Sequence, residues 1–226
     1  ALESLIQQGL VYPCYCSRAE LRQAASAPHG SDRNNIYPGY CRNLTMAQRQ
    51  FKEASGRRPA LRLMVPDCTI AFIDGLYGLV RQNLRQECGD FILQRSDGVH
   101  AYQLAVVVDD AAMGITHVLR GNDLLDSTPR QLLLYELLEL TPPAFIHVPL
   151  LYGTDGHRLS KRQKDLTIAS LRARGCSPYK IVGYLAWQAG LKERWEETPP
   201  RDLITDFNVS RLTTRPIIVD TDVLQK

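Results

Sequence analysis

A basic loop of seven residues carries the side chains of this 226-residue sequence that are best suited to bind phosphate. It reads Gly156-His157-Arg158-Leu159-Ser160-Lys161-Arg162 and follows a predicted strand. Open α/β sheets bind ligands beyond the carboxyl ends of their strands, and an ammonium on a flexible stem can follow charge that develops during phosphoryl or nucleotidyl transfer. A solvated basic turn has the same composition, so the loop alone leaves both interpretations open.

Three of the six cysteines have a spacing that suits a structural zinc ion. Cys14 and Cys16 are two residues apart, and Cys41 follows a stretch rich in Gly, Pro, Asn and Asp at residues 27–39. Such a composition is typical of a turn-dense knuckle, and three thiolates with one further ligand complete a tetrahedral site. Free cysteines in a small core are the alternative.

Two residues compete for the fourth position. His29 is favoured by chemistry, because neutral imidazole is an ordinary zinc ligand, whereas the phenol of Tyr37 must first lose a proton. Tyr37 lies four residues before the third cysteine, close enough to bind beside it. The remaining three cysteines have no ligand spacing and are predicted to be buried thiols: Cys68, Cys88 and Cys176.

The elements that position the basic loop predict the α/β fold class. Residues 114–120 form a short segment rich in β-branched side chains, which indicates a buried strand. Residues 129–140 begin with Pro and place leucines on one face, which indicates a helix. Residues 144–151 form the next predicted strand. This order is typical of half of a parallel sheet.

Weaker patterns predict the other elements. Residues 1–9 have the pattern of the last turns of a helix, 102–113 fit a helix or a strand equally, and helical segments alternate with Gly and Pro breaks after residue 164. A short surface helix is predicted at 45–55, and strands at 60–66, 69–73 and 90–98.

Composition excludes several classes of protein. With 44% hydrophobic and 23% charged residues, the chain can bury a core without disulfides, and no apolar run approaches the length that crosses a bilayer. A formal charge of +3 permits RNA binding without arguing for it. We expect a cytoplasmic protein with reduced cysteines and no membrane attachment.

Several segments together resemble the glutamyl-tRNA synthetase family of class I aminoacyl-tRNA synthetases. Residues 158–162 look like the KMSKS-type loop of that class, and residues 114–123, GITHVLRGND, resemble the family's ITHVxRGxD segment. Residues 127–131 and 146–150 follow in the family's order. The resemblance spans nearly the whole chain.

The motifs are most similar in sequence to one branch of the family, which attaches glutamate to queuosine in tRNA(Asp). Residues 102–110 and the knuckle of Cys14, Cys16, Tyr37 and Cys41 resemble that branch. Its zinc ligands are three cysteines and one tyrosine, so the resemblance favours Tyr37 over His29.

The resemblance implies a Rossmann-like nucleotide-binding domain of the class I type, of which this chain carries the second half, with a zinc-bearing insertion and a C-terminal helical region. The four implied segments are the end of the first Rossmann half (1–12), the insertion (13–93), the second half with the KMSKS-like loop (94–164) and the helical region (165–226).

The family's site residues carry over where the motifs match. Tyr102 and Arg120 are expected to hold glutamate, because a guanidinium fork pairs with a carboxylate and a phenol adds an orienting hydrogen bond. Lys161 is expected to contact ATP and stabilise the departing pyrophosphate, with Ser160 helping to position it. No covalent nucleophile is needed, since the glutamate carboxylate attacks the α-phosphate.

The implied function is ATP-dependent activation of glutamate and its transfer to queuosine in the anticodon loop of tRNA(Asp). The expected cofactors are structural Zn²⁺ and ATP with Mg²⁺, and the expected assembly is a monomer. RNA contacts are expected from the arginines around the knuckle: Arg18, Arg42, Arg57, Arg58 and Arg62.

The sequence departs from the family's pattern in three ways that bear on the choice of zinc ligand and of function. No His-x-Gly-His segment occurs in the sequence, so we expect that the first half of the fold is absent and that this polypeptide alone does not form adenylate. Twenty residues separate Cys16 from Tyr37, which keeps His29 as a candidate ligand. Only 64 residues follow Arg162, which favours the queuosine branch because that branch needs no anticodon-binding domain. The alternatives are a fragment of a synthetase that charges tRNA(Glu) and a non-catalytic, zinc-bearing tRNA-binding module.

Overall fold

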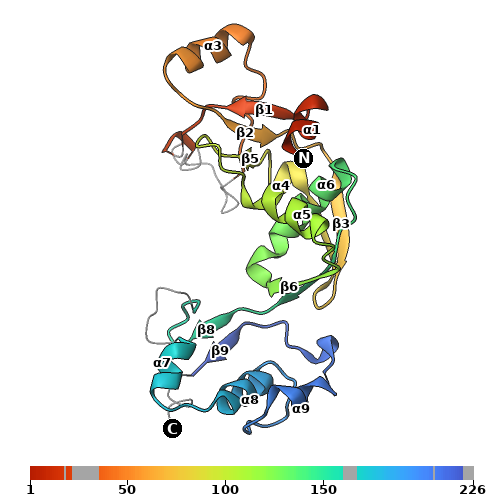
Figure 1. The fold of residues 1–226 in the computed structure, drawn as a ribbon, viewed down its shortest axis with the longest axis vertical. Coiled ribbons are helices and arrows are strands. Elements are labelled where there is room, and N and C mark those ends of the chain that lie inside the picture. Colours follow the sequence, from red (N-terminus) through yellow and green to blue (C-terminus); the bar gives the residue numbers. More distant parts are fainter. Residues whose placement is uncertain (18, 22–35, 160–166, 206, 221–226) are drawn as a thin grey trace. The chain divides into compact units, whose positions relative to one another are not determined.

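The computed structural model describes residues 1–17, 19–21, 36–159, 167–205 and 207–220, and these form two compact units (Figure 1). The first unit comprises residues 1–72, 79–116 and 126–143. The second comprises residues 73–78 and 117–125 together with the described residues from 144 onward.

A three-stranded antiparallel sheet of order β1-β2-β5 organises the first unit. Its strands are β1 (Val11–Cys14), β2 (Ala60–Leu63) and β5 (Ile92–Gln94). Helix α1 (Leu2–Gln7) precedes the sheet and ends before Gly9, whose φ of 71° suits glycine at a helix C-terminus. Leu5, Leu63 and Leu93 are fully buried and form part of the core of this unit.

Helices and a hairpin complete the first unit. Polar side chains link its two longest helices, because Gln103 of α5 donates to Ser127 at 3.1 Å and accepts from Gln131 of α6 at 2.8 Å. The hairpin of β3 and β4 begins and ends in this unit and its tip belongs to the second unit. The elements are β3 (Thr69–Asp74), β4 (Gly78–Asn83), α3 (Met46–Ala54), α4 (Leu84–Glu87), α5 (Tyr102–Ala112) and α6 (Thr128–Leu137).

Parallel strand pairs form the second unit. β6 (His117–Gly121) pairs with β7 (Ala144–Val148), and β8 (Leu151–Gly153) pairs with β9 (Ile217–Val219). Leu171 and Tyr184 pack with residues of β9 in its hydrophobic core. The remaining elements are the helices α7 (Ile168–Ala173), α8 (Pro178–Gln188) and α9 (Pro200–Ile204) and the 3-10 turns η1 (Asn122–Ser127) and η3 (Val209–Arg211).

Most predicted elements are confirmed, including the helices at 45–55 and 129–140 and the parallel strands at 114–120 and 144–151. Residues 102–113 are a helix. The mixed α/β class is confirmed as well. Among the described residues, no helix is long and apolar enough to cross a membrane. The division into four sequence segments stays a prediction.

Four expectations about burial or secondary structure were wrong. β6 is not a buried strand, since Leu119 is 65% exposed. Arg62 is not a surface arginine available to RNA, because it is 6% exposed. The three cysteines without ligand spacing are partly exposed rather than buried. The C-terminal region is not purely helical, because β9 returns to pair with β8.

The buried carboxylate of Asp90 links several segments of the first unit by hydrogen bonds. Asp90 accepts hydrogen bonds from the Tyr12 hydroxyl at 2.7 Å, the Arg42 guanidinium at 3.0 Å and the Val65 backbone N–H at 2.8 Å. Its own carbonyl accepts from Arg62 at 2.8 Å. A buried charge is tolerated when it is paired and hydrogen-bonded in this way.

Replacing this carboxylate should therefore destabilise the first unit. We expect Asp90→Asn to lower the free energy of unfolding by about 3 kcal/mol, because the amide leaves Arg42 without its counter-charge. Urea titration followed by circular dichroism measures the change. Asp97→Asn is the matched control: its partner Arg95 is exposed, so the effect should stay within about 0.5 kcal/mol. Equal urea midpoints for the two variants would contradict this account of Asp90.

Candidate functional site

Four side chains of the first unit converge into one cluster. The Sγ atoms of Cys14, Cys16 and Cys41 all lie within 4.8 Å of one another, and Cys16 Sγ is 3.6 Å from Cys41 Sγ. The hydroxyl oxygen of Tyr37 lies 3.4 Å from Cys14 Sγ and 3.7 Å from Cys16 Sγ. The predicted grouping of these four residues is therefore present.

These distances fit a tetrahedral zinc ion. Zinc at about 2.3 Å from sulfur and about 2.0 Å from oxygen places two sulfurs about 3.8 Å apart, and sulfur and oxygen about 3.5 Å apart. Three separations lie within a few tenths of an ångström of those edges: Cys16 Sγ to Cys41 Sγ, and the Tyr37 oxygen to Cys14 Sγ and to Cys16 Sγ. Three cysteine thiolates are typical zinc ligands, and the Tyr37 oxygen is placed to supply the fourth donor once its proton is lost.

The surrounding chain holds the cluster in place. Cys14 ends β1, and Tyr37 forms an isolated bridge with Gly89, where a Cβ would lie 2.8 Å from the Tyr37 carbonyl oxygen. The backbone N–H of Cys41 donates to the Tyr37 hydroxyl at 2.9 Å. The guanidinium of Arg62 lies 3.8 Å from the centre of the Tyr37 ring. A buried cation therefore adjoins a group of potential anions.

Burial opposes ionisation of most of this cluster. It raises the pKa of the Cys16 thiol to about 12 and raises the pKa of the Tyr37 phenol above its ordinary value. Burial also opposes ionisation of Cys14, but the hydrogen bond with Tyr37 and the nearby Arg62 outweigh it, so the pKa of Cys14 lies below its ordinary value. A metal ion that binds the ionised ligands must displace protons.

A hydrogen-bonded chain of three side chains lies in the second unit. Arg120 of β6 and His147 of β7 are register partners, and the Nε of Arg120 donates to His147 Nε2 at 3.0 Å. His147 Nδ1 lies 2.6 Å from Asp74 Oδ2. The Arg120 guanidinium also lies 5.1 Å from the centre of the Phe145 ring. Strand pairing thus fixes the predicted glutamate-binding arginine from one side.

The other predicted site residues are distributed between the units. Tyr102 is the first residue of α5 in the first unit and is 51% exposed. In the second unit, Arg158 forms an ion pair with Asp123 at 2.9 Å, and the backbone N–H of Leu159 donates to the Leu151 carbonyl at 2.9 Å. Five predicted residues lie outside the described part of the chain: Arg18, His29, Ser160, Lys161 and Arg162.

Sequence reasoning missed Asp74 and His147 as members of this arrangement. His147 lies in the segment 146–150, which carried the family resemblance, and it interrupts an otherwise apolar strand. That interruption was the available signal. Asp74 lies directly after the predicted strand at 69–73, and its partner is 73 residues away in the sequence, so spacing could not connect them.

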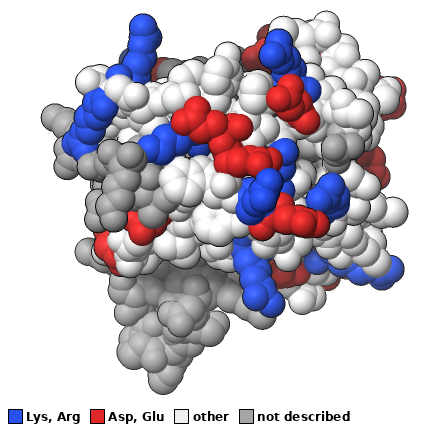
Figure 2. Space-filling model, turned by 90° about the horizontal axis from the view of Figure 1, so that it is seen from below, with Lys and Arg blue, Asp and Glu red and all other residues white. Residues whose placement is uncertain are grey.

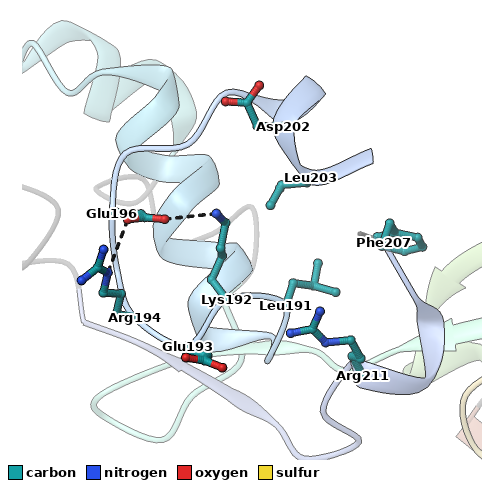
Figure 3. A pocket seen from close by; sticks show the side chains of 9 residues that line it. All are labelled: Leu191, Lys192, Glu193, Arg194, Glu196, Asp202, Leu203, Phe207 and Arg211. Atoms are coloured by element: carbon teal, nitrogen blue, oxygen red, sulfur yellow. Dashed lines mark hydrogen bonds and ion pairs between the residues drawn. The ribbon is translucent and has the colours of Figure 1, made fainter. Parts of the chain in front are cut away.

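A surface cavity of about 390 Å³ lies in the second unit between the end of α8, α9 and the turn after it (Figure 3). Acidic and basic side chains both line it, and Glu196 pairs with Lys192 at 3.1 Å and with Arg194 at 3.5 Å. Acidic and basic side chains are also interspersed on the face shown in Figure 2. Among the described residues in these two views, no patch of basic side chains alone is seen of the kind that binds a phosphate backbone.

Comparison with known proteins gives one consistent family. The model of the catalytic domain of class I tRNA synthetases (E and Q) matches residues 1–226. The chain is 51% identical to a glutamyl-Q tRNA(Asp) synthetase of Nitratidesulfovibrio vulgaris, over 100% of this chain and 69% of that protein. It is 50% identical to the same-named protein of Symbiobacterium thermophilum, over 99% and 69%.

More distant matches share the fold. A glutamate–tRNA ligase of Heliobacterium modesticaldum is 39% identical over 99% of this chain and 45% of its own length. The crystal structure of a glutamate tRNA ligase from Elizabethkingia meningosepticum matches with a TM-score of 0.77 at 22% identity, over 99% of this chain and 50% of that one. The chain thus spans about half of the ligases and about two-thirds of the glutamyl-Q synthetases.

The buried pair of Asp74 and His147 should make the second unit sensitive to acid. Burial opposes ionisation of Asp74, but the bonds from His147 and from the backbone N–H groups of Tyr77 and Leu76 outweigh it, so the pKa of this carboxyl lies below its ordinary value. A carboxyl with a lowered folded-state pKa stabilises the fold above its unfolded pKa of about 3.9, and this contribution is lost as pH falls through the folded pKa.

Asp74→Asn should therefore lower the free energy of unfolding at pH 7 by about 3 kcal/mol and flatten its dependence on pH below about 4. Denaturant titrations at several pH values measure both effects. Asp155→Asn, which alters an exposed carboxylate bonded only to a loop N–H in the described part, is the matched control and should change little. An unaltered acid dependence in Asp74→Asn would refute the assignment.

Proposed function

This chain belongs to the family of class I tRNA synthetases (E and Q), and we propose that the protein containing it activates glutamate with ATP and transfers it to queuosine in the anticodon loop of tRNA(Asp). The family supplies a glutamyl-tRNA-synthetase-like ligase activity. The choice of RNA acceptor is the finer part of the proposal.

The main support for this acceptor is the difference in sequence identity between two groups of relatives. Proteins named glutamyl-Q tRNA(Asp) synthetase are 51% and 50% identical to the chain, whereas a glutamate–tRNA ligase is 39% identical over the same region. The segment 102–110 and the knuckle with Tyr37 support the same branch.

Arg120 and Tyr102 are proposed to bind glutamate. The guanidinium of Arg120 is held on β6 by His147, which suits bidentate recognition of a carboxylate. Tyr102 is partly exposed at the start of α5, where its hydroxyl can reach a ligand.

Lys161 and Ser160 are proposed to act on ATP. In the first step the glutamate carboxylate attacks the α-phosphate of ATP, which forms glutamyl-adenylate and releases pyrophosphate. In the second, a queuosine hydroxyl attacks the activated carbonyl, which forms an ester and releases AMP. Neither step needs a covalent protein intermediate, so the protein orients the reactants and stabilises developing charge, and Mg²⁺ arrives with ATP.

A structural zinc ion is proposed to join Cys14, Cys16, Tyr37 and Cys41. Its contribution is to close the knuckle, since four protein ligands leave no open position for a substrate. His29 remains the competing fourth ligand. The proposal also includes the expected cytoplasmic monomer.

A transfer assay distinguishes the acceptors. The full-length gene product is incubated with ATP, labelled glutamate and either queuosine-containing tRNA(Asp) or tRNA(Glu). We expect label on tRNA(Asp) only, and at least a hundredfold slower labelling by Arg120→Lys, because a lysine offers no guanidinium fork. Labelling of tRNA(Glu) alone would favour the second candidate, a synthetase that charges that tRNA. Absence of ATP–pyrophosphate exchange would instead favour a non-catalytic tRNA-binding module.

Metal analysis tests the ligand set. We expect one zinc ion per purified chain, loss of most zinc in Cys41→Ser, and weakened zinc retention against a chelator in Tyr37→Phe, because three ligands remain. His29→Ala is the matched variant and should retain zinc as the parent does. Zinc loss in His29→Ala with retention in Tyr37→Phe would show that His29, and not Tyr37, is the fourth ligand.

A further inference from the structure

We propose that His147, oriented by Asp74, is a positioning residue that fixes the Arg120 guanidinium for the glutamate carboxylate. The inference rests on the proposed function, in which Arg120 binds glutamate. Neither His147 nor Asp74 needs to touch the substrate, since both act through Arg120.

The direction of the hydrogen bonds follows from the chemistry of the groups. A guanidinium has donors only, so the contact of 3.0 Å from Arg120 Nε requires His147 Nε2 to be unprotonated. The single ring proton of the neutral imidazole then lies on Nδ1, 2.6 Å from Asp74 Oδ2. Asp74 thereby selects the tautomer that can accept from Arg120, as a carboxylate does for a catalytic histidine.

The Asp74 carboxylate is itself immobilised. Its Oδ1 accepts from the backbone N–H groups of Leu76 at 3.0 Å and Tyr77 at 2.9 Å, and its Oδ2 accepts from the backbone N–H of His147 at 3.1 Å. The side chains of Asp74 and His147 are both completely buried. A carboxylate with bonds on both oxygens has one stable orientation.

Close packing at the hairpin tip supports the same geometry. The Gly75 N–H donates to the Phe145 carbonyl of β7 at 2.9 Å, and a Cβ on Gly75 would lie 2.7 Å from Ile146 Cγ1. Only glycine lets the tip approach β7 this closely. Asp74, the preceding residue, is thereby placed beside His147.

The imidazole of His147 is neutral, so it can orient the Arg120 guanidinium without forming an ion pair with it. If Asp74 itself contacted the guanidinium, the two would form an ion pair that competes with the substrate carboxylate. With His147 between them, the Nε edge of Arg120 is occupied by a neutral acceptor. Arg120 Nη2 also donates to the Leu124 carbonyl at 3.5 Å. Each terminal nitrogen carries two N–H groups, so the substrate carboxylate would share the end-on edge formed by Nη1 and Nη2 with that carbonyl, and the preset plane would lower the entropic cost of binding.

Steady-state kinetics of the full-length gene product test the inference. In glutamate-dependent ATP–pyrophosphate exchange, we expect His147→Leu to raise the KM for glutamate about tenfold and leave the KM for ATP unchanged, because leucine offers no acceptor. His147→Gln, whose amide oxygen can accept from Arg120, should recover most of the loss. His100→Leu, an exposed histidine of the first unit, is the matched control.

A spectroscopic readout keeps the test informative if His147→Leu folds poorly. The Nε–H resonance of Arg120 should exchange slowly with water in the parent and in His147→Gln, and should exchange faster in Asp74→Asn. An unchanged glutamate KM in folded His147→Leu, or equal increases for glutamate and ATP, would overturn the inference while leaving the proposed function intact. Absence of glutamate-dependent exchange in the parent would instead overturn the proposed function, and the inference with it.

Discussion

A cation that must remain available to a carboxylate has to be held by groups that do not neutralise it. The proposed role of Arg120 imposes that requirement on the second unit, where the bonded neighbour of its Nε is His147 and Asp74 lies one step further away. The parallel register of β6 and β7 sets the two residues opposite each other, and the glycine at the hairpin tip brings Asp74 within reach. The positions of these elements can thus be understood as serving the orientation of one guanidinium.

The first unit has the opposite requirement, since it gathers three thiols and a phenol that would become anionic on binding the proposed zinc ion. Arg62 is buried against the Tyr37 ring, close to the thiols, and it also donates to the Asp90 carbonyl. Asp90 in turn joins strands and loops that are distant in the sequence. The cluster is therefore built on a network of buried charges with assigned partners, in which the loss of one partner costs more than the pair itself contributes.

The sequence was sufficient to predict local structure and the motifs, and insufficient for long-range polar pairing. Helix 129–140 was predictable because Pro in its first turn and its leucines are local signals. The Cys14–Cys16 pair was recognisable from its local spacing, whereas Tyr37 was favoured over His29 only by the family resemblance. The burial of Arg62 was not predictable, since an alternating strand pattern assigns arginine to the solvent side and the partner that reverses this is Asp90. The link between Asp74 and His147 was hidden for the same reason.

The site of glutamate attachment is the most direct test of the account. After reaction of the full-length gene product with ATP, glutamate and queuosine-containing tRNA(Asp), the RNA is digested to nucleosides and analysed by mass spectrometry. The account predicts queuosine that is heavier by one esterified glutamate, and unmodified 3′-terminal adenosine. Glutamate on the terminal adenosine, with queuosine unchanged, would contradict it.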